Sequence, residues 1–149
     1  MARDRKIKSE KVILASDHAG FRLKEEIKKF LIKKRKKVLD LGTKNTNSVD
    51  YPDYAHLISR KMKNNKNQLG ILICGSGTGM SMSANKHKNI RAALCYDTKS
   101  AKLSRLHNNA NVMTLGSRLI KKSVAIKCVN TFLKTNFDGG RHVRRVKKI

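Results

Sequence analysis

Short apolar runs alternate with amphipathic segments along almost the whole chain. Apolar runs of strand length lie at residues 11–16, 37–41, 69–74, 90–96 and 111–115. Between them, apolar residues recur at helical spacing in segments that begin near residues 21, 52, 80, 98 and 123. A run this short is typical of a strand that is buried on both faces. The alternation predicts a Rossmann-like, three-layer α/β/α fold with a five-stranded parallel sheet.

Chain length and composition favour one folded domain over residues 11–149, preceded by a basic N-terminal extension over residues 1–10. No apolar run approaches the ~18 residues that span a bilayer, and the first residues lack the apolar segment of a secretory signal. We therefore expect a cytoplasmic protein without a membrane partner. The three cysteines, Cys74, Cys95 and Cys128, show no CxxC spacing, which indicates reduced thiols.

The formal net charge of +25 at pH 7 raises the question of a nucleic-acid partner. The lysines are spread along the chain, Trp is absent, and the few aromatic residues do not interleave with the basic runs. We therefore predict a solvated basic surface and no nucleic-acid partner, with nucleic-acid binding kept as the alternative function from another class. The same charge attracts small anionic substrates over long range.

A glycine loop follows the third apolar run in the segment GILICGSGTGMSMSANK. Gly75, Gly77 and Gly79 alternate with polar residues before a helical segment, an arrangement that cradles an anion in backbone N–H groups. No Gly-Lys-Ser/Thr closes the loop, so it is not a Walker A motif. A dinucleotide site would carry an acidic residue that binds the ribose about 20 residues after the glycine loop, and Asp97 is near that position. However, Met80 stands where the third glycine of GxGxxG belongs, and the loop does not follow the first strand.

Cys74 is the last residue of the third predicted strand and faces this cradle. A thiol beside a helix N-terminus and several N–H donors is stabilised as the nucleophilic thiolate. An isolated cysteine is more often a buried, unreactive residue. Cys95 and Cys128 fit this description because they lie among the apolar residues of a predicted strand and a predicted helix.

Other polar groups are candidates for the same edge of the sheet. Asp17 and His18 directly follow the first strand, and Arg118 follows the fifth. His107 and Asn108 lie at the end of a helix. The tail contributes Arg141, His142 and Arg145, of which the two arginines share a helical face. Each histidine alone is more often a surface residue than a catalyst. No three residues have metal-ligand spacing, so we predict no metal.

Several separate motifs together resemble the type B ribose-5-phosphate isomerase family, which belongs with the galactose-6-phosphate isomerase subunits. They are ASDHAGFRLK, DLGT with SVDYPDYA, GILICGSGTGMSMSANK, IRAALCYD, SRLHNNANVMTLGSR and FDGGRHVRRVKKI. The resemblance extends over residues 11–149.

The resemblance implies an aldose–ketose isomerase that interconverts ribose 5-phosphate and ribulose 5-phosphate through an enediolate, without cofactor or metal. It implies that Cys74 is the base, that Ser76 relays protons, and that His107 with Asp17 opens the sugar ring. Some relatives use a Glu at the position of Met80; methionine cannot be a base, so this chain depends on Cys74. The implied substrate-binding residues are His18, Gly75, Gly77, Thr78, Gly79, Asn108, Arg118, Arg141, His142 and Arg145.

The implied partner is a phosphorylated sugar, and the implied assembly is a homodimer or a dimer of dimers with shared active sites. Galactose 6-phosphate and allose 6-phosphate remain alternative substrates, because residue spacing does not distinguish a pentose from a hexose.

Overall fold

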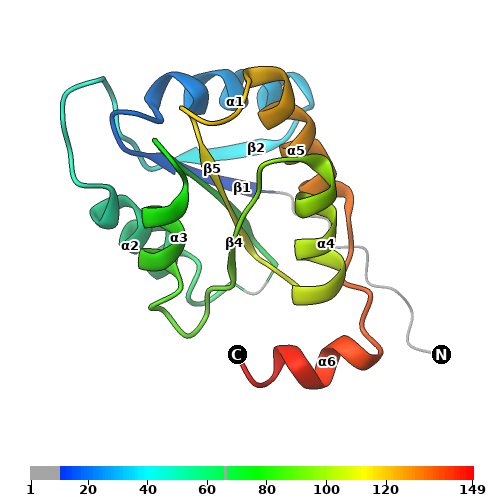
Figure 1. Cartoon of the computed structure of the whole chain (residues 1–149). Helices are drawn as coiled ribbons and strands as arrows, with labels where there is room; N and C mark the ends of the chain where they lie inside the picture. The colour runs from blue at the N-terminus through cyan, green and yellow to red at the C-terminus, as the bar shows by residue number, and fades with distance from the viewer. Residues whose placement is uncertain (1–10, 66) are drawn as a thin grey trace.

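The computed structural model describes residues 11–65 and 67–149, and it has the predicted three-layer α/β/α architecture (Figure 1). All neighbouring strands pair in parallel, in the order β2-β1-β3-β5-β4, which confirms the predicted sheet. The basic segment 1–10 lies outside the described residues. The strands are β1 (Lys11–Ser16), β2 (Lys37–Asp40), β3 (Leu69–Cys74), β4 (Ala92–Leu94) and β5 (Val112–Gly116). The helices are α1 (Phe21–Lys33), α2 (Tyr51–Lys61), α3 (Thr78–Ala84), α4 (Thr98–Asn108), α5 (Lys122–Lys134) and α6 (Arg141–Val146). In the described part of the chain, no helix is long and apolar enough to cross a membrane.

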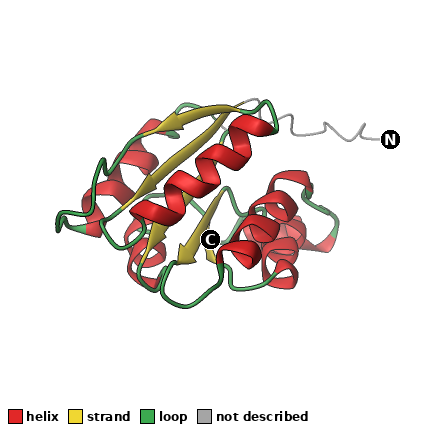
Figure 2. Cartoon of the chain, turned by 90° about the horizontal axis from the view of Figure 1, so that it is seen from above, coloured by secondary structure: helices red, strands yellow, loops and turns green. Residues whose placement is uncertain are grey.

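The strands are apolar on both faces because helices cover both faces of the twisted sheet (Figure 2). Val12 and Leu14 of β1 belong to one apolar cluster, with residues of α1, α4 and α5. Ile13 and Ala15 point the other way and belong to a second cluster, with residues of α2 and α3. Alternate side chains of each strand therefore serve different helix layers.

The chain leaves β1 and β3, which are neighbours in the sheet, toward opposite faces. The helix after β1 packs in the first apolar cluster, and the helix after β3 packs in the second. Between two such connections an open α/β sheet leaves a crevice at the carboxyl ends of its strands. The topology thus fixes where a ligand site belongs.

Strand β4 is shorter than the predicted strand over residues 90–96, and side chains bond several of the backbone groups in it and beside it. Arg91 N donates to the Asn111 side chain (2.8 Å). On the open edge, Asn85 bonds both backbone groups of Ala92, accepting from its N–H (2.7 Å) and donating to its oxygen (2.9 Å). Tyr96 N donates to Ser100 Oγ (3.1 Å) at the start of α4.

The N-cap of α4 is Asp97, the residue directly before Thr98. Asp97 Oδ1 accepts from Ser100 N (2.7 Å), and Ser100 Oγ accepts from Asp97 N (3.2 Å) in a capping box. Because the Asp97 carboxylate caps its own helix, it is not directed at a ribose. The dinucleotide interpretation therefore loses its only supporting residue.

A buried ion cluster joins α1 to the end of β2. Lys24 of α1 is charged, yet it is only 1% exposed, and its Nζ lies 2.6 Å from Asp40 and 2.8 Å from Glu25. Asp40 also bonds Lys28 (3.0 Å) and Gly42 N (2.9 Å). Burial alone raises the pKa of Asp40, but the hydrogen bonds from Lys24, Gly42 and Lys28 outweigh it and hold that pKa below its ordinary value.

We expect Asp40→Asn to destabilise the fold by about 3 kcal/mol, because it leaves the buried Lys24 amine without its nearest countercharge. The stabilisation by Asp40 is present above the ordinary carboxyl pKa and is lost as the pH falls through the lower pKa of the folded state. Urea unfolding between about pH 3 and 7 should therefore show a larger difference between wild type and variant at pH 7. Glu26→Gln is the control, since it removes a carboxylate that forms only exposed pairs, with Lys29 and Lys122. Equal losses in the two variants would contradict the role given to Asp40.

Candidate active site

A crevice of about 410 Å³ opens at the carboxyl edge of the sheet, where the topology predicts it. Its walls are the loops after β1, β3 and β5, with one aromatic residue from the start of α2. It brings together half of the site residues predicted from the sequence. The lining residues are Asp17, His18, Ala19, Tyr51, Cys74, Gly75, Ser76, Gly79, Arg118 and Leu119.

The thiol of Cys74 lies at the end of β3, on the wall of this crevice. Its Sγ accepts a hydrogen bond from Gly77 N at 3.2 Å, within the loop that leads to α3. Only 4% of Cys74 is exposed, and the residue also packs in the second apolar cluster. Ser76 Oγ accepts from Thr78 N (3.3 Å), so the hydroxyl of Ser76 is held beside the same loop.

Two loop glycines are required by the geometry. Gly77 has φ of +77°, a left-handed conformation that favours glycine, and a Cβ there would lie 2.6 Å from Leu94 Cδ1. A Cβ on Gly79 would lie 2.5 Å from the ring of Tyr51. The glycines therefore let the loop approach both β4 and α2 closely.

Asp17 and His18 form the opposite wall at the end of β1. Asp17 Oδ1 accepts from Gly20 N (3.0 Å), and Asp17 N donates to Ile73 O (3.2 Å), which ties this turn to β3. His18 Nδ1 accepts from Val49 N (3.2 Å), so a neutral His18 ring carries its proton on Nε2. His18 can thus donate a hydrogen bond from Nε2 to an anionic ligand.

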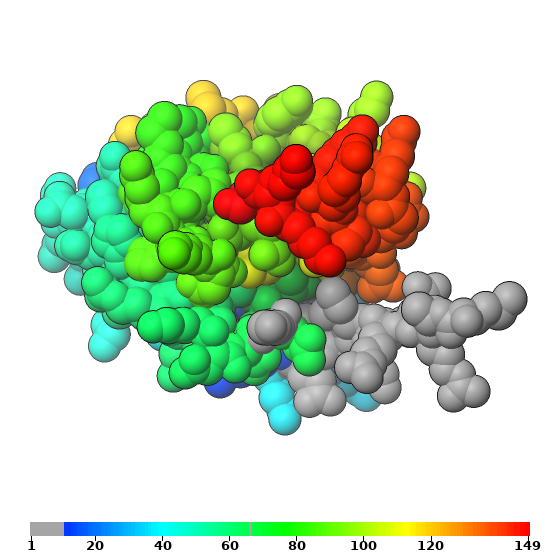
Figure 3. Space-filling model, turned by 90° about the horizontal axis from the view of Figure 1, so that it is seen from below, coloured from blue at the N-terminus to red at the C-terminus, as the bar shows by residue number. Residues whose placement is uncertain are grey.

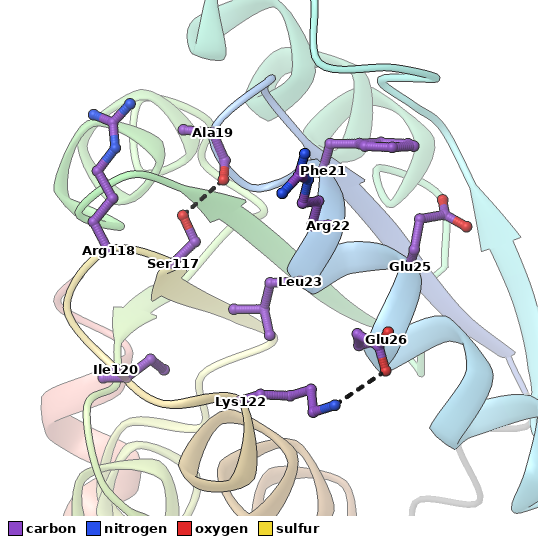
Figure 4. A pocket seen from close by; sticks show the side chains of 10 residues that line it. All are labelled: Ala19, Phe21, Arg22, Leu23, Glu25, Glu26, Ser117, Arg118, Ile120 and Lys122. Carbon is purple, nitrogen blue, oxygen red and sulfur yellow. Dashed lines mark hydrogen bonds and ion pairs between the residues drawn. The ribbon is translucent and has the colours of Figure 1, made fainter.

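The loop after β5 completes the crevice and is bonded to both other loops. Ser117 N donates to Cys74 O (2.9 Å), and Arg118 N donates to Gly75 O (3.0 Å). Ser117 Oγ donates to Ala19 O (2.8 Å), as Figure 4 shows. Arg118 and Ala19 also border a neighbouring pocket of about 530 Å³ beside α1, which is the pocket drawn in Figure 4.

Three lining residues were not predicted from the sequence: Ala19, which follows Asp17 and His18 in the turn after β1, Tyr51 and Leu119. Tyr51 begins α2 within the segment SVDYPDYA, and its ring packs against Gly79. A loop after β2 reaches the same edge of the sheet as the other loops, and that position could have identified Tyr51. Leu119 is exposed and directly follows Arg118; no sequence signal marks it.

A second cluster forms at the end of α4, where it meets the C-terminal tail. The rings of His107 and His142 are stacked, with centroids 4.3 Å apart and planes inclined by 15°. Asp138 N donates to Leu106 O (3.1 Å), which attaches the tail to this helix. Burial, then His107 and the arginines of α6, Arg141 and Arg145, lower the pKa of His142. Figure 3 shows α6 and the chain end on the surface of the molecule.

The structure does not bring this second cluster to the crevice of the same chain. Helix α4 starts at the carboxyl edge of the sheet and ends near its amino edge, where Asn111 O accepts from Gly70 N (2.9 Å). From Gly70 to Cys74, β3 rises about 13 Å. The prediction that these groups gather at the carboxyl edge is therefore wrong within a single chain. They are His107, Asn108, Arg141, His142 and Arg145.

The other two cysteines are buried in the apolar cluster between the sheet and α5, as predicted. Burial raises the pKa of Cys95 to about 12 and that of Cys128 to about 11. Both thiols therefore stay protonated at neutral pH. Among residues 11–65 and 67–149, no three His, Cys, Asp or Glu side chains are grouped so as to hold a metal ion.

The crevice lies where the chain leaves β1 and β3 toward opposite faces of the parallel sheet, and it holds a thiol, a carboxylate and basic groups. These features define an α/β protein with a site for a small molecule. Residues 12–149 match the family described as Ribose/Galactose Isomerase, and the chain belongs to this family. It is 48% identical over 139 residues to the probable ribose-5-phosphate isomerase B of Mycoplasma pneumoniae, over 93% of this chain and 91% of that protein.

Solved structures agree with this assignment. The structure is similar to ribose 5-phosphate isomerase of Thermotoga maritima, with a TM-score of 0.90 and 51% identity over 93% of this chain and 95% of that one. It is also similar to ribose-5-phosphate isomerase B of Mycoplasma genitalium with bound ribulose-5-phosphate. That TM-score is 0.89, with 48% identity over 93% of this chain and 92% of that one.

We expect iodoacetamide to modify Cys74 in the folded protein and to leave Cys95 and Cys128 unmodified until unfolding. Cys74 is 4% exposed and lines the crevice, whereas Cys95 and Cys128 are 1% and 0% exposed and burial raises the pKa of both thiols. Peptide mass spectrometry over a time course measures each rate. Cys74→Ser is the control, and its folded form should take up no label. Labelling of Cys95 as fast as Cys74 would contradict this assignment.

Proposed function

We propose that the chain is an aldose–ketose isomerase that interconverts ribose 5-phosphate and ribulose 5-phosphate, without metal or cofactor, in the cytoplasm. The observation that carries the proposal is the position of Cys74. Its thiol stands in the crevice beside a loop of backbone amides, in a family whose Mycoplasma genitalium member has been solved with bound ribulose-5-phosphate.

In this proposal Cys74 acts as the base on the open-chain sugar. The thiolate takes the proton from C2 of the aldose, the C1 carbonyl oxygen becomes part of an enediolate, and the same thiol returns the proton to C1. Ser76 moves the second proton between the O1 and O2 oxygens. The loop amides from Gly75 to Gly79 stabilise the enediolate oxygen where negative charge develops. Met80 is fully buried in the core and has no basic group, so it takes no part.

Ring opening and phosphate binding require both clusters. Asp17 and His107 together move a proton from the C1 hydroxyl to the ring oxygen. In one chain these residues lie at opposite edges of the sheet, so the proposal assigns His107 to the crevice of a second subunit. His18 and Arg118 hold the phosphate from within the crevice. Arg141, His142 and Arg145, with Asn108, reach the same substrate from the partner.

The proposed assembly is accordingly a homodimer, alone or paired into a dimer of dimers. Two-fold symmetry lets each chain give its α4–α6 cluster to its partner's crevice and receive the same in return. The separation of two incomplete clusters within each chain supports this arrangement. The net charge of +25 favours the approach of an anionic sugar phosphate.

Isomerisation of ribose 5-phosphate by the purified protein tests the function directly, with galactose 6-phosphate and allose 6-phosphate measured in parallel. If kcat/KM is higher for either hexose phosphate, that sugar becomes the proposed substrate and the isomerase mechanism stays the same. No turnover of the three sugars by a folded oligomer would overturn the proposal.

We expect Cys74→Ala to lower kcat on ribose 5-phosphate by on the order of 10² or more, the usual contribution of a positioned base. The matched control is Cys128→Ala, which removes a thiol that the mechanism does not use. Circular dichroism establishes that both variants are folded. Turnover of folded Cys74→Ala close to that of wild type would exclude Cys74 as the base.

If the active sites are shared between subunits, mixing two inactive variants should restore part of the isomerase activity. Cys74→Ala lacks the base and Arg141→Ala lacks a phosphate ligand, so a mixed dimer contains one site with neither defect. After random exchange of subunits, about a quarter of all sites should be intact. Activity is measured before and after exchange through mild denaturation and refolding. No recovery, with mixed dimers demonstrated by native mass spectrometry, would indicate sites built within one chain.

A further inference from the structure

Arg105 is a buried cation on α4, two residues before His107. It is 1% exposed, and none of the ion pairs within residues 11–65 and 67–149 includes it. Burial and, second, the nearby Arg91 lower its pKa to about 10, so it remains charged at neutral pH. Burying a charge without a counterion is costly, so its contacts require an explanation.

The guanidinium of Arg105 joins two separate segments of the chain. Nη1 donates to Asn109 Oδ1 (3.2 Å) and to Ala110 O, both just after the end of α4. Nε donates to Thr135 O (3.1 Å), where α5 ends and the tail begins. The guanidinium also lies over the ring of Phe132, 5.6 Å from its centroid. A planar fork can bond oxygens on both segments at once, which a lysine amine cannot do in the same way.

These two segments carry the two stacked imidazoles. His107 lies on the last turn of α4, and the tail after Thr135 leads to His142 on α6. Asn109, whose side chain bonds Arg105, ends α4 in a left-handed conformation with φ of +46°. One side chain therefore joins the end of the helix to the start of the tail, in addition to the backbone hydrogen bond from Asp138 N to Leu106 O.

We propose that Arg105 is a positioning residue for the His107–His142 pair, because its guanidinium fixes the end of α4 against the start of the tail. It touches neither substrate nor reacting atoms. It sets the separation and the angle of the two rings. Its importance for catalysis rests on the proposed function, in which this pair enters the crevice of a partner subunit.

Arg91 provides a matched control. Its guanidinium is also partly buried, and its Nε donates to Asn109 O (2.8 Å), in the same loop that Arg105 holds. This hydrogen bond is with the loop and not with Thr135. Arg91→Met therefore removes a similar cation from the loop while leaving the link to the tail in place.

The test compares Arg105→Met with Arg91→Met in the full chain without substrate. Histidine ring signals are assigned by NMR and titrated with pH. We expect Arg105→Met to lose the cross-peaks between the rings of His107 and His142. We also expect the pKa of His142 to move up toward its ordinary value, because His107 is one of the charges that lower it, with Arg141 and Arg145, while Asp138 raises it. Arg91→Met should keep both features.

Activity provides a second measurement. Displacement of a catalytic group by about 1 Å can lower turnover by about 10², so kcat on ribose 5-phosphate should fall by that order in Arg105→Met and stay unchanged in Arg91→Met. If Arg105→Met does not fold, Arg105→Lys replaces it, because lysine keeps the charge but not the fork. Unaltered ring cross-peaks in the folded Arg105 variant would overturn the proposal. Since these signals are read without substrate, that result is independent of whether the wild type isomerises ribose 5-phosphate.

Discussion

The site depends on the register in which β3 pairs with its two neighbours. Ser16 of β1 lies beside Ile73, and Cys74 lies beside Gly116 of β5, so the three strands end almost level. Their loops therefore start side by side and bond one another directly, as Ser117 N does to the Cys74 carbonyl. Side chains alternate between the faces of a sheet, so a slip of one residue would turn the thiol to the opposite face. Accurate strand pairing is thus a condition for the chemistry as well as for the fold.

A second constraint follows from the direction of the helices. Every helix that connects two parallel strands must return from the carboxyl edge to the amino edge, so a group at a strand end and a group at the following helix end are separated by the depth of the sheet. Cys74 and His107 occupy these two kinds of position. In the proposed enzyme, catalytic competence therefore depends on assembly: a folded single chain holds all the residues and no complete site.

The sequence predicted much of this arrangement for physical reasons. Continuous apolar runs mark strands buried on both faces, and the glycine loop marked the crevice. The start of β4 and the cap of α4 involve side chains that bond nearby backbone groups, and Asn111 and Asp97 form these bonds only in the folded chain. The burial of Lys24 depends on Asp40, 16 residues away. The site was predicted at the strand ends, but within one chain His107 lies at the other edge of the sheet, since residue order alone does not give the edge at which a helix ends.

The side chain of Asn85 has a consequence for the behaviour of the protein in solution. Strand β4 is one edge of the sheet, and unpaired backbone groups on such an edge can recruit a strand from another molecule. Asn85 presents an amide to Ala92 with one donor and one acceptor, as an adjoining strand would, and so occupies that part of the edge. The carboxamide therefore occupies at Ala92 the groups through which a strand of another molecule would pair with this edge.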